Sequence, residues 1–510
     1  MRNKGYVTVF VTLLIAALLL IFTVVYKIVD ISAARSRSSI ALKTACSSVK
    51  AEWTNEYIFD HYHILLIDMS AGGSGESGLA DEIKASMEEN LGEGYSVENV
   101  SISGRTGILD DDCDAFKEQI SDYALYGLTE FAADKLLEKT EGKDKPISDE
   151  SIAAMDKETE GISDEEPEQS GQVGNQNSGQ SAGQQPGQGQ NQGSGQQPGQ
   201  GQNQGSGQQP GLVQALTTED PRKEVRRVKK AGVYRYILPE DTEFSETSLD
   251  LKTLPSYGKR GLAGFAIESN FDSYLRLKKD MNKGSGWLEG LAAGGEALAY
   301  AHGMFNSLTE KRNDDTVLNL ELEYIIAGKE TDAENYKKVI NQIIAIRFAC
   351  NFAYILTDAE KMAEVNTLAI TLTIFFPFMQ PVVKYLLAGC WAYVEGVADA
   401  FSLVRGKKIP YIKSRESWKT SLDGISKLAE VADKDSGCDE ESGMDYNDYL
   451  MILMALHMDT AYLRMLDIMQ VNAAQQTPGF SMREAAVALG ADAEVSYKEG
   501  HFTLHSEDGY

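Results

Sequence analysis

The sequence predicts a helix-dominated α+β protein with a long N-terminal transmembrane and stalk helix, a small α/β segment, a disordered linker and a mostly helical C-terminal domain. Three observations predict this class: an apolar run at the start, a low-complexity tract near the middle, and apolar residues at helical spacing through the second half. The expected organisation is a membrane anchor at residues 1–27, a stalk helix and small α+β segment at 28–140, a linker at 141–222 and a helix-rich domain at 223–510.

The chain begins with a segment long enough to cross a bilayer. Tyr6–Tyr26 contains no charged residue, and a helix of this length extends over about 31 Å, close to the thickness of about 30 Å of a bilayer core. A cleaved secretory signal is the alternative, since Arg2 and Lys4 supply a basic start. The apolar run is longer than that of a signal peptide, and KIVD at 27–30 follows it instead of small residues. We therefore expect a retained signal-anchor.

The helix is predicted to continue beyond the membrane as a stalk. No glycine or proline lies between Tyr6 and Tyr57, so one helix over this range would be about 78 Å long. Apolar or small residues recur on one face of its second half, at Ile31, Ala34, Ser38, Ala41, Ala45, Val49 and Trp53.

Composition restricts the environment and the partners. The 76 Asp and Glu residues outnumber the 48 Lys and Arg residues, for a net charge of −28, which argues against nucleic acid as a partner because phosphates need a basic surface. Basic residues are more numerous just after the apolar run than before it, so the positive-inside rule does not favour export, but it counts weakly for long translocated domains. We expect a single-pass protein of the cell membrane, with the N-terminus inside and the bulk of the chain extracytoplasmic.

A low-complexity tract divides the chain. Residues 184–195 and 196–207 both have the sequence QQPGQGQNQGSG, and the acidic stretch 144–168 leads into them. Such a tract has almost no apolar surface to bury, so we expect it to be disordered. It is either a tether for the C-terminal domain or a tolerated repeat expansion in a loop.

Short strands and helices are expected on both sides of the linker. We expect a short buried strand at His63–Met69 and further strands at Tyr95–Ile102 and Gly232–Leu238. An amphipathic helix is predicted at Ala115–Leu137, and the chain should be mostly helical from Leu275 onward.

Two capping-box patterns, Thr331 with Glu334 and Thr357 with Glu360, predict helices that start near Asp332 and Asp358. The remaining expectations are a buried face of Ile343, Ile344, Phe348, Phe352 and Leu356, a helix at Tyr446–Asn472, and a hairpin at Glu494–Ser506 that turns at Glu499-Gly500.

A second apolar run allows two interpretations. Thr367–Val383 is uncharged but contains Pro377 and Pro381. It is either a short, broken membrane segment or a pair of buried core helices.

The sequence predicts no catalytic, cofactor-binding or metal site. Asp68, Ser70 and Gly72 follow an apolar strand and partly match a metal site, but Gly72 replaces a hydroxyl ligand, so a strand followed by a turn is the simpler interpretation. Asp110–Asp114 lacks the later residues of a calcium loop and is interpreted as an acidic helix start.

Other polar motifs are equally weak. His61 and His63 lack a third ligand, and Gly104–Gly107 is interpreted as a turn. The five cysteines have no C-x-x-C spacing and do not suggest a disulfide framework; they are Cys46, Cys113, Cys350, Cys390 and Cys438.

Six segments stand out on both sides of the linker: KGYVTVFVTLLIAALLL, SAARSRSSIALKTACSSVKAEW, ILPEDTEFSETSLDLKTLPS, LELEYIIAGKETDAENYKKVI, SLVRGKKIPYIKSRESWKTSL and YNDYLMILMALHMDTAYLRML. Together they resemble domain-of-unknown-function family 5702, membrane proteins of Gram-positive bacteria that are similar to pseudopilin-type components of tight-adherence (Tad/Flp) pilus loci. The resemblance implies a leader that ends at Lys4-Gly5 and cleavage before Tyr6, whereas Phe10 stands where a pilin has glutamate.

The first functional hypothesis is therefore a structural or accessory, pseudopilin-like component of a pilus or secretion system, which is not an enzyme and needs no cofactor. Its expected partners are the lipid bilayer and other proteins of that assembly. The alternative is a surface-exposed binding module or envelope enzyme held by a flexible tether.

Overall fold

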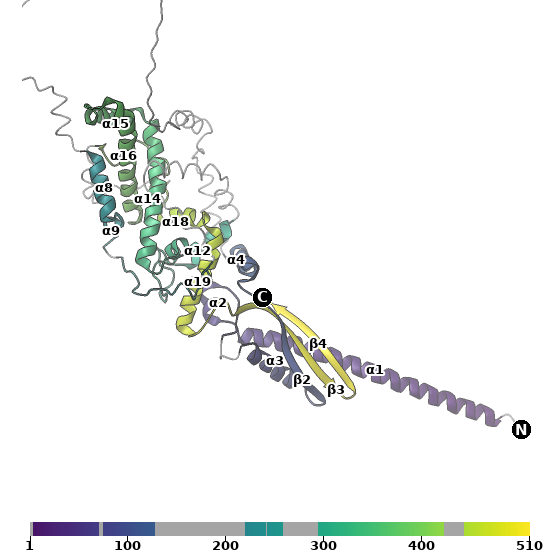
Figure 1. Ribbon diagram of the computed structural model, residues 1–510. Coiled ribbons are helices and arrows are strands. Elements are labelled where there is room, and N and C mark those ends of the chain that lie inside the picture. Colours follow the sequence, from purple (N-terminus) through teal and green to yellow (C-terminus); the bar gives the residue numbers. More distant parts are fainter. Residues whose placement is uncertain (1–3, 71–74, 128–219, 241, 259–293, 423–442) are drawn as a thin grey trace, which may run out of the picture.

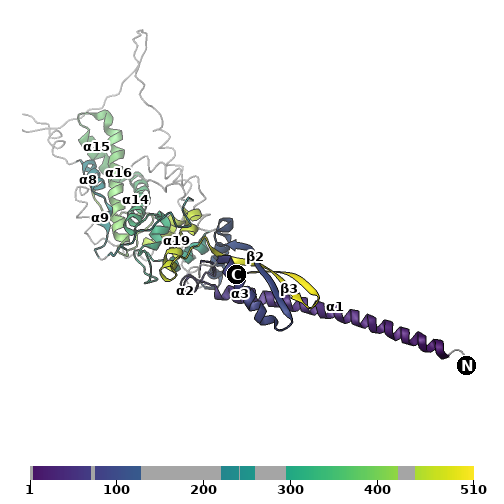
Figure 2. The same cartoon turned by 60° about the horizontal axis from the view of Figure 1, so that its bottom comes forward.

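The computed structural model describes residues 4–70, 75–127, 220–240, 242–258, 294–422 and 443–510. The molecule is elongated: helix α1 (Lys4–Glu52) projects from one end, and helices α15 (Ala359–Leu372) and α16 (Gln380–Leu403) form the other (Figures 1 and 2). A small sheet lies beside α1, and a larger helical body lies between the sheet and α15. The helix-dominated α+β class is confirmed.

The sheet joins the two ends of the chain. Its strands are β1 (Ile67–Asp68), β2 (Tyr95–Gly107), β3 (Ala485–Tyr497) and β4 (Gly500–Gly509), and all pairs are antiparallel. Strand β3 is central, because it pairs with β2 along one edge and with β4 and β1 along the other. The C-terminal strands therefore complete a sheet that N-terminal residues begin (Figure 1).

The predicted C-terminal hairpin is confirmed and is longer than expected. Tyr497 pairs with Gly500, which leaves Lys498 and Glu499 as a two-residue loop. Lys498 has φ of 52°, the left-handed conformation that short hairpin loops require.

The second half of α1 lies on the sheet together with α3 (Gly75–Leu91). The predicted stripe is confirmed, since Ala34, Ser38, Ala41, Ala45 and Val49 are buried. Strand residues that share this core alternate along β3 and β4; they are Leu489, Ala491, Ala493, Val495, Phe502 and Leu504. Burial of apolar surface at about 25 cal/mol per Å² holds helix and sheet together.

Helix α1 ends at Glu52, before the predicted end at Tyr57. Thr54 forms an isolated bridge with Ile67 of β1, and the side chain of Asn55 caps the next helix by accepting from the backbone N–H of Ile58 at 3.0 Å. The strand contact and the new cap stop α1.

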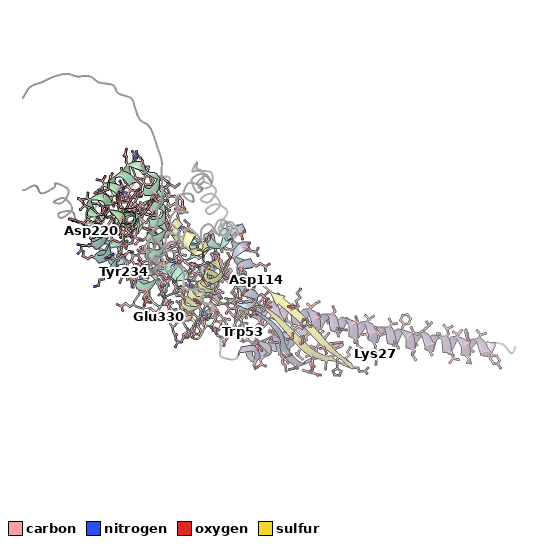
Figure 3. The ribbon with its side chains drawn as sticks, turned by 45° about the horizontal axis from the view of Figure 1, so that its top comes forward. Lys27, Trp53, Asp114, Asp220, Tyr234 and Glu330 are labelled. Atoms are coloured by element: carbon pink, nitrogen blue, oxygen red, sulfur yellow. The ribbon has the colours of Figure 1, made fainter. Side chains whose placement is uncertain are left out.

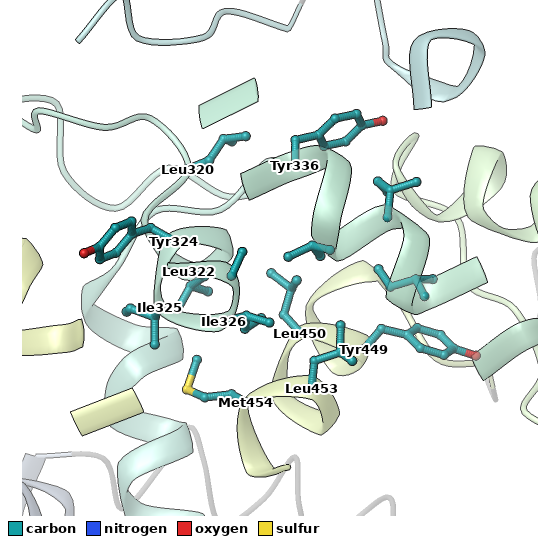
Figure 4. Packing of buried hydrophobic residues seen from close by; sticks show 14 of the residues in the cluster. Leu320, Leu322, Tyr324, Ile325, Ile326, Tyr336, Tyr449, Leu450, Leu453 and Met454 are labelled. Carbon is teal, nitrogen blue, oxygen red and sulfur yellow. The ribbon is translucent and has the colours of Figure 1, made fainter. Parts of the chain in front are cut away.

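The helical body has one continuous apolar core. Figure 4 shows the part where buried side chains of α13, α14 and α18 meet, among them Leu322, Tyr336 and Leu450. The body comprises α2 (Glu56–Tyr62), η2 (Asp110–Cys113), α4 (Asp114–Gly127), α8 (Pro221–Ala231), α9 (Tyr234–Ile237), α12 (Gly295–Met304), α13 (Glu321–Ala327), α14 (Asp332–Thr357), α15, η3 (Pro377–Met379), α16, α18 (Tyr446–Ala455) and α19 (Met458–Gln476).

Packing crosses the predicted domain boundaries. Helix α2 contacts α19 and α4 contacts α12, so parts of the predicted 28–140 segment belong to the helical body. Conversely, β3 and β4 lie outside the helix-rich domain expected at 223–510, because they pair with β2 and contact α1. The linker expected at 141–222 lies almost entirely outside the described residues.

Two predicted strands differ from the structure. Gly232–Leu238 contains the short helix α9, because Val233 and Ile237, at helical spacing, are both buried. His63–Met69 forms only the two-residue strand β1. The backbone of Leu65 instead hydrogen-bonds to the side chain of Gln119 through both its N–H (2.7 Å) and its C=O (3.0 Å), so a side chain replaces the neighbouring strand.

Two helix predictions also change, and a third is confirmed over its described residues. Tyr446–Asn472 is two helices broken at Leu456-His457. The cap at Thr331 is confirmed, but the cap of α15 is the carboxylate of Asp358, which accepts from two backbone N–H groups, and not Thr357. The predicted helix at Ala115–Leu137 is α4, and its expected residues after 127 lie outside the described part.

The run Thr367–Val383 forms the turn of a helical hairpin. Helix α15 ends at Leu372 and α16 begins at Gln380, with Pro377 in the first turn of η3 and Pro381 in the first turn of α16, where proline is tolerated. Among the described helices, α1 and α14 are long and apolar enough to span a bilayer, and α14 is mostly buried within the protein.

Helices α14 and α16 approach closely at Gly396. A Cβ atom there would lie 3.2 Å from the carbonyl oxygen of Ile344 and 3.3 Å from the backbone nitrogen of Phe348. These are backbone atoms, so a methyl group would push the helices apart. Gly389, two turns earlier in α16, has its nearest neighbour at 4.0 Å.

We therefore expect Gly396→Ala to lower the free energy of unfolding by about 1–3 kcal/mol, the usual cost of overpacking. The control Gly389→Ala should be neutral or stabilise by up to about 1 kcal/mol, because alanine favours a helix over glycine. Thermal unfolding of the full chain in detergent measures both, and equal melting temperatures for the two variants would contradict the close approach.

Candidate functional site

The first half of α1 is an unpartnered apolar helix. Every side chain from Tyr6 to Val29 is exposed, on all sides of the helix, and the first buried residue is Ala34. A helix that is apolar all round needs an apolar environment. Its length and composition are compatible with a single membrane anchor.

The β3–β4 loop meets α1 where the apolar segment ends. The ammonium group of Lys27 lies 3.2 Å from the carboxylate of Glu499, and that of Lys498 lies 2.6 Å from the carboxylate of Asp30. Figure 3 shows Lys27 beside the end of the hairpin. These pairs are largely exposed, so they contribute little to stability. They bring the sheet to the end of the apolar segment.

A more buried contact ties the other end of the hairpin to α1. The carboxylate of Asp508 accepts hydrogen bonds from the hydroxyl of Ser47 (2.6 Å) and the ammonium of Lys50 (2.9 Å). Partial burial would raise the pKa of Asp508, but the hydrogen bonds from Ser47 and Lys50 outweigh it and hold the pKa below its usual value. Tyr510 adds a hydrogen bond from its hydroxyl to the carbonyl oxygen of Lys50 at 3.0 Å.

The sequence candidates for metal ligands take part in local structure. The Asp68 carboxylate accepts from the side chain of Asn55 at 3.2 Å and from the N–H and hydroxyl of Ser70, so it stabilises a turn. Gly72 lies outside the described residues. In the part of the chain that the structure describes, no group of three or more His, Cys, Asp or Glu side chains could hold a metal ion.

The acidic run Asp110–Asp114 precedes helix α4, as expected. Three consecutive residues, Asp111 to Cys113, have left-handed φ between 48° and 65°, and the carboxylate of Asp110 accepts from the N–H of Gly107 at 2.7 Å. The expected turn at Gly104–Gly107 is wrong, because these residues form the end of β2 beside two irregularities in register.

The two histidines face different partners. His61 stacks on Tyr57 with ring centroids 4.1 Å apart, and His63 stacks on Tyr123 at 4.8 Å. Cys46, Cys350 and Cys390 are free thiols, and Cys438 lies outside the described residues.

A buried pair of carboxylates that the sequence analysis missed supports the loop before α13. Glu321 accepts from the N–H of Asn306 (2.9 Å) and from the side chain of Asn472 (2.7 Å). Glu323 accepts through Oε1 from the N–H of Leu308 (3.0 Å) and the hydroxyl of Tyr446 (2.9 Å), while its Oε2 has no hydrogen-bond partner among the residues that the structure describes. Burial raises the pKa of Glu321 to about 8 and that of Glu323 to about 7.

A second buried set pairs α14 with α16 and the segment after it. Arg347 Nε lies 2.9 Å from Asp399, Lys413 lies 2.6 Å from the other oxygen of Asp399, and Lys413 also contacts Glu395. Burial opposes ionisation of Asp399, but Lys413 and Arg347 outweigh it and hold the pKa well below its usual value. The two cations, Arg347 and Lys413, face two carboxylates, Asp399 and Glu395, so the set has no net charge.

An open pocket of about 660 Å³ lies beside the helical body. Its lining residues are Pro239, Thr242, Glu243, Ser307, Leu308, Thr309, Glu310, Lys311, Asn319, Leu320, Val404, Arg405 and Gly406. Several polar groups there have protein partners: the Arg405 guanidinium donates to two backbone carbonyls, Glu310 contacts Arg312, and the Ser307 hydroxyl donates to the side chain of Asn447 at 2.9 Å. Among the described residues that line this pocket there is no histidine or cysteine.

Comparison with known proteins gives one match. Residues 213–497 match a family of unknown function, DUF5702, which covers more than half of the chain. No curated protein and no solved structure matches. The matched range includes most of the helical body and β3 but not α1.

We predict that Asp508→Asn lowers the free energy of unfolding by about 1–2 kcal/mol, because it removes the charged acceptor that binds Ser47 and Lys50 of α1. The exposed neighbour on the same strand gives the control, Glu507→Gln, which should change little. A folded-state pKa below the ordinary 3.8 means that the stabilisation is present at neutral pH and is lost as the pH falls through the lowered value. Unfolding of the full chain in detergent at pH 7 and at pH 3 measures this, and an equal loss from both variants at pH 7 would contradict it.

We also predict a pH dependence from Glu323. Its raised pKa means that stability is greatest below the ordinary value of 4.5 and falls as the pH rises toward about 7, by up to about 1.4 kcal/mol per pH unit. Glu323→Gln keeps the accepting oxygen and cannot ionise, so it should gain stability relative to the native chain between pH 5 and pH 8.

Glu321→Gln is the matched comparison, because both of its oxygens accept hydrogen bonds and an amide NH₂ would meet a donor. We expect it to lose about 1–3 kcal/mol already at pH 5. Denaturant unfolding at pH 5 and pH 8 distinguishes the variants. If the stability of Glu323→Gln depends on pH as that of the native chain does, Glu323 is not the titrating group.

Proposed function

The chain belongs to DUF5702, a family of unknown function, and we propose that it is a single-pass membrane protein of the Gram-positive cell envelope that acts as a structural or accessory, pseudopilin-like component of a pilus or secretion system. In this role it is not an enzyme. Its partners are the lipid bilayer and other proteins of the assembly, and the bulk of the chain is extracytoplasmic.

The layout of α1 is the observation on which the proposal rests. One unbroken helix exposes an apolar first half and buries its second half against an antiparallel sheet. A helix arranged in this way joins an apolar segment to a folded domain without a flexible hinge. The sheet and helical body can therefore keep a fixed position relative to α1 when the apolar halves of several such helices pack together.

The helical body supports a structural role rather than catalysis. The charged groups at its centre pair with one another, as Arg347 and Lys413 do with Asp399. The described carboxylates Glu321 and Glu323 hold backbone N–H groups of a loop. The alternative of a binding module would use the pocket near Arg405, whose lining residues Glu310 and Ser307 already bond within the protein.

Photocrosslinking from α1 tests the proposal. A photoreactive amino acid at Leu18, which is exposed in the apolar half, should form adducts with a second copy or another protein of the assembly in cells that assemble fibres. The same group at Ile40, exposed in the half that lies on the sheet, is the control and should give a different partner set. Lipid adducts alone at Leu18, with unchanged fibres and secretion after deletion of the gene, would refute the role.

Topology has its own test. With epitope tags in the segment 141–222 and after Tyr510, protease treatment of intact protoplasts should remove both tags if the head is outside. Protection of both tags would place the head in the cytoplasm. The mature N-terminus, determined on membrane-extracted protein, shows whether the chain is cleaved before Tyr6.

A further inference from the structure

We propose that the turn of the α15–α16 hairpin is a shallow lipid-inserting element that binds a lipid surface other than the bilayer entered by α1. We call this turn the apex and define it by its exposed apolar residues: Ile370, Phe375, Phe376, Phe378, Met379, Val382 and Leu386.

The apex exposes more apolar surface than its fold requires. Phe375, Phe376 and Phe378 are 57%, 62% and 76% exposed, although an aromatic side chain can bury roughly 150–250 Å². Large contiguous apolar patches are uncommon on soluble surfaces and mark contact sites. Phe376 and Phe378 pack edge to face, with ring centroids 6.3 Å apart, so the rings form one protruding cluster.

The polar side chains around the apex are satisfied within the hairpin. The hydroxyls of Thr367, Thr371 and Thr373 each donate to the backbone carbonyl four residues earlier, and Gln380 donates to Asn366 at 3.1 Å. A protein interface usually forms about one hydrogen bond per 100–200 Å², whereas the acyl region of a bilayer offers none. Internal satisfaction therefore favours lipid as the occupant.

The distribution of charged residues also favours lipid as the occupant. Thr367–Val383 is uncharged in a chain with a net charge of −28, and the next residues are Lys384 and Tyr385. The Lys384 ammonium lies 5.7 Å from the centre of the Tyr385 ring. Lysine and tyrosine are typical of the membrane–water interface, so this pair marks the depth at which insertion stops.

The apex is held on a rigid support. Helices α15 and α16 pack on each other, and α16 packs along α14. Lys361 of α15 lies 4.2 Å from the ring of Trp391 and 4.0 Å from that of Trp418. The apolar turn is therefore presented before binding, which lowers the entropy cost of insertion.

The position of the apex identifies which lipid surface it can reach. Figures 1 and 2 both place α15 and the start of α16 at the end of the molecule opposite to the N-terminus of α1. When α1 stands in its bilayer, the apex faces away from that bilayer. The protein would then connect two lipid surfaces, and because binding is apolar it should require neither anionic lipid nor low salt.

Vesicle flotation tests this with the full chain held in a nanodisc by α1. Added phosphatidylcholine vesicles should carry the nanodisc-bound protein upward in a density gradient, to a similar extent in 50 mM and 500 mM salt. The triple variant Phe375→Ser, Phe376→Ser, Phe378→Ser should bind at least tenfold more weakly. The matched control changes three exposed apolar residues outside the apex, Phe59→Ser, Tyr257→Ser and Ile412→Ser, and should bind like the native chain.

Three outcomes would overturn the proposal. One is failure of the native chain to float with vesicles, and another is equal loss in the two triple variants. The third is assembly of native nanodiscs with one another in the absence of vesicles, abolished only by the apex variant, which would make the apex a protein interface. Equal melting temperatures of the variants confirm that each is folded.

Discussion

Strand β3 hydrogen-bonds to β2 along nearly its whole length, and the rest of the arrangement depends on this pairing. The chain leaves the sheet at Gly107, forms the helical body, and returns at Ala485. The next strand, β4, then contacts α1 and places Asp508 beside Lys50. The end of the chain therefore holds the apolar helix α1, and the helical body, apart from α2, is an insertion between two adjacent strands.

This topology explains how α1 can position the distant helical body. The sheet fixes the helical body relative to α1, because it packs on α1 and continues into the body through β3. The apolar core of the body includes Ala485 and Val487 at the start of that strand. Force applied to the head would reach α1 through the sheet.

Within the body, buried charges set the relative positions of the helices. Asp399 of α16 bonds at once to Arg347 of α14 and to Lys413 beyond α16. Removing one partner of such a set leaves an uncompensated charge, so only one register satisfies all four groups. The close approach at Gly396 needs the same register. The rigid α14–α16 pair is also what holds the apex at the far end of the molecule.

The predictions that were confirmed depend on residues close together in the chain. The apolar run from Tyr6, the buried stripe on α1 and the C-terminal hairpin are local patterns of hydrophobicity and spacing, so the sequence by itself determined them. The hairpin turns at Lys498-Glu499, one residue before the predicted Glu499-Gly500. The short helix α9 was predicted as a strand, because the sequence does not reveal which neighbouring segments bury its residues. Glu321 and Glu323 gave no signal, since their partners Asn472 and Tyr446 are far away in the chain.

The sequence therefore determined the long apolar helix at the N-terminus, the helix-dominated class and the resemblance to DUF5702. The tertiary structure decided which segments share a core, that the two ends of the chain form one sheet, and that Thr367–Val383 is the exposed turn of a hairpin. The sheet depends on contacts between residues hundreds of positions apart, and the hairpin on contacts tens of positions apart. Neither kind of contact leaves a periodic pattern in the sequence. Burial in each case is a property of the assembled fold, not of the segment.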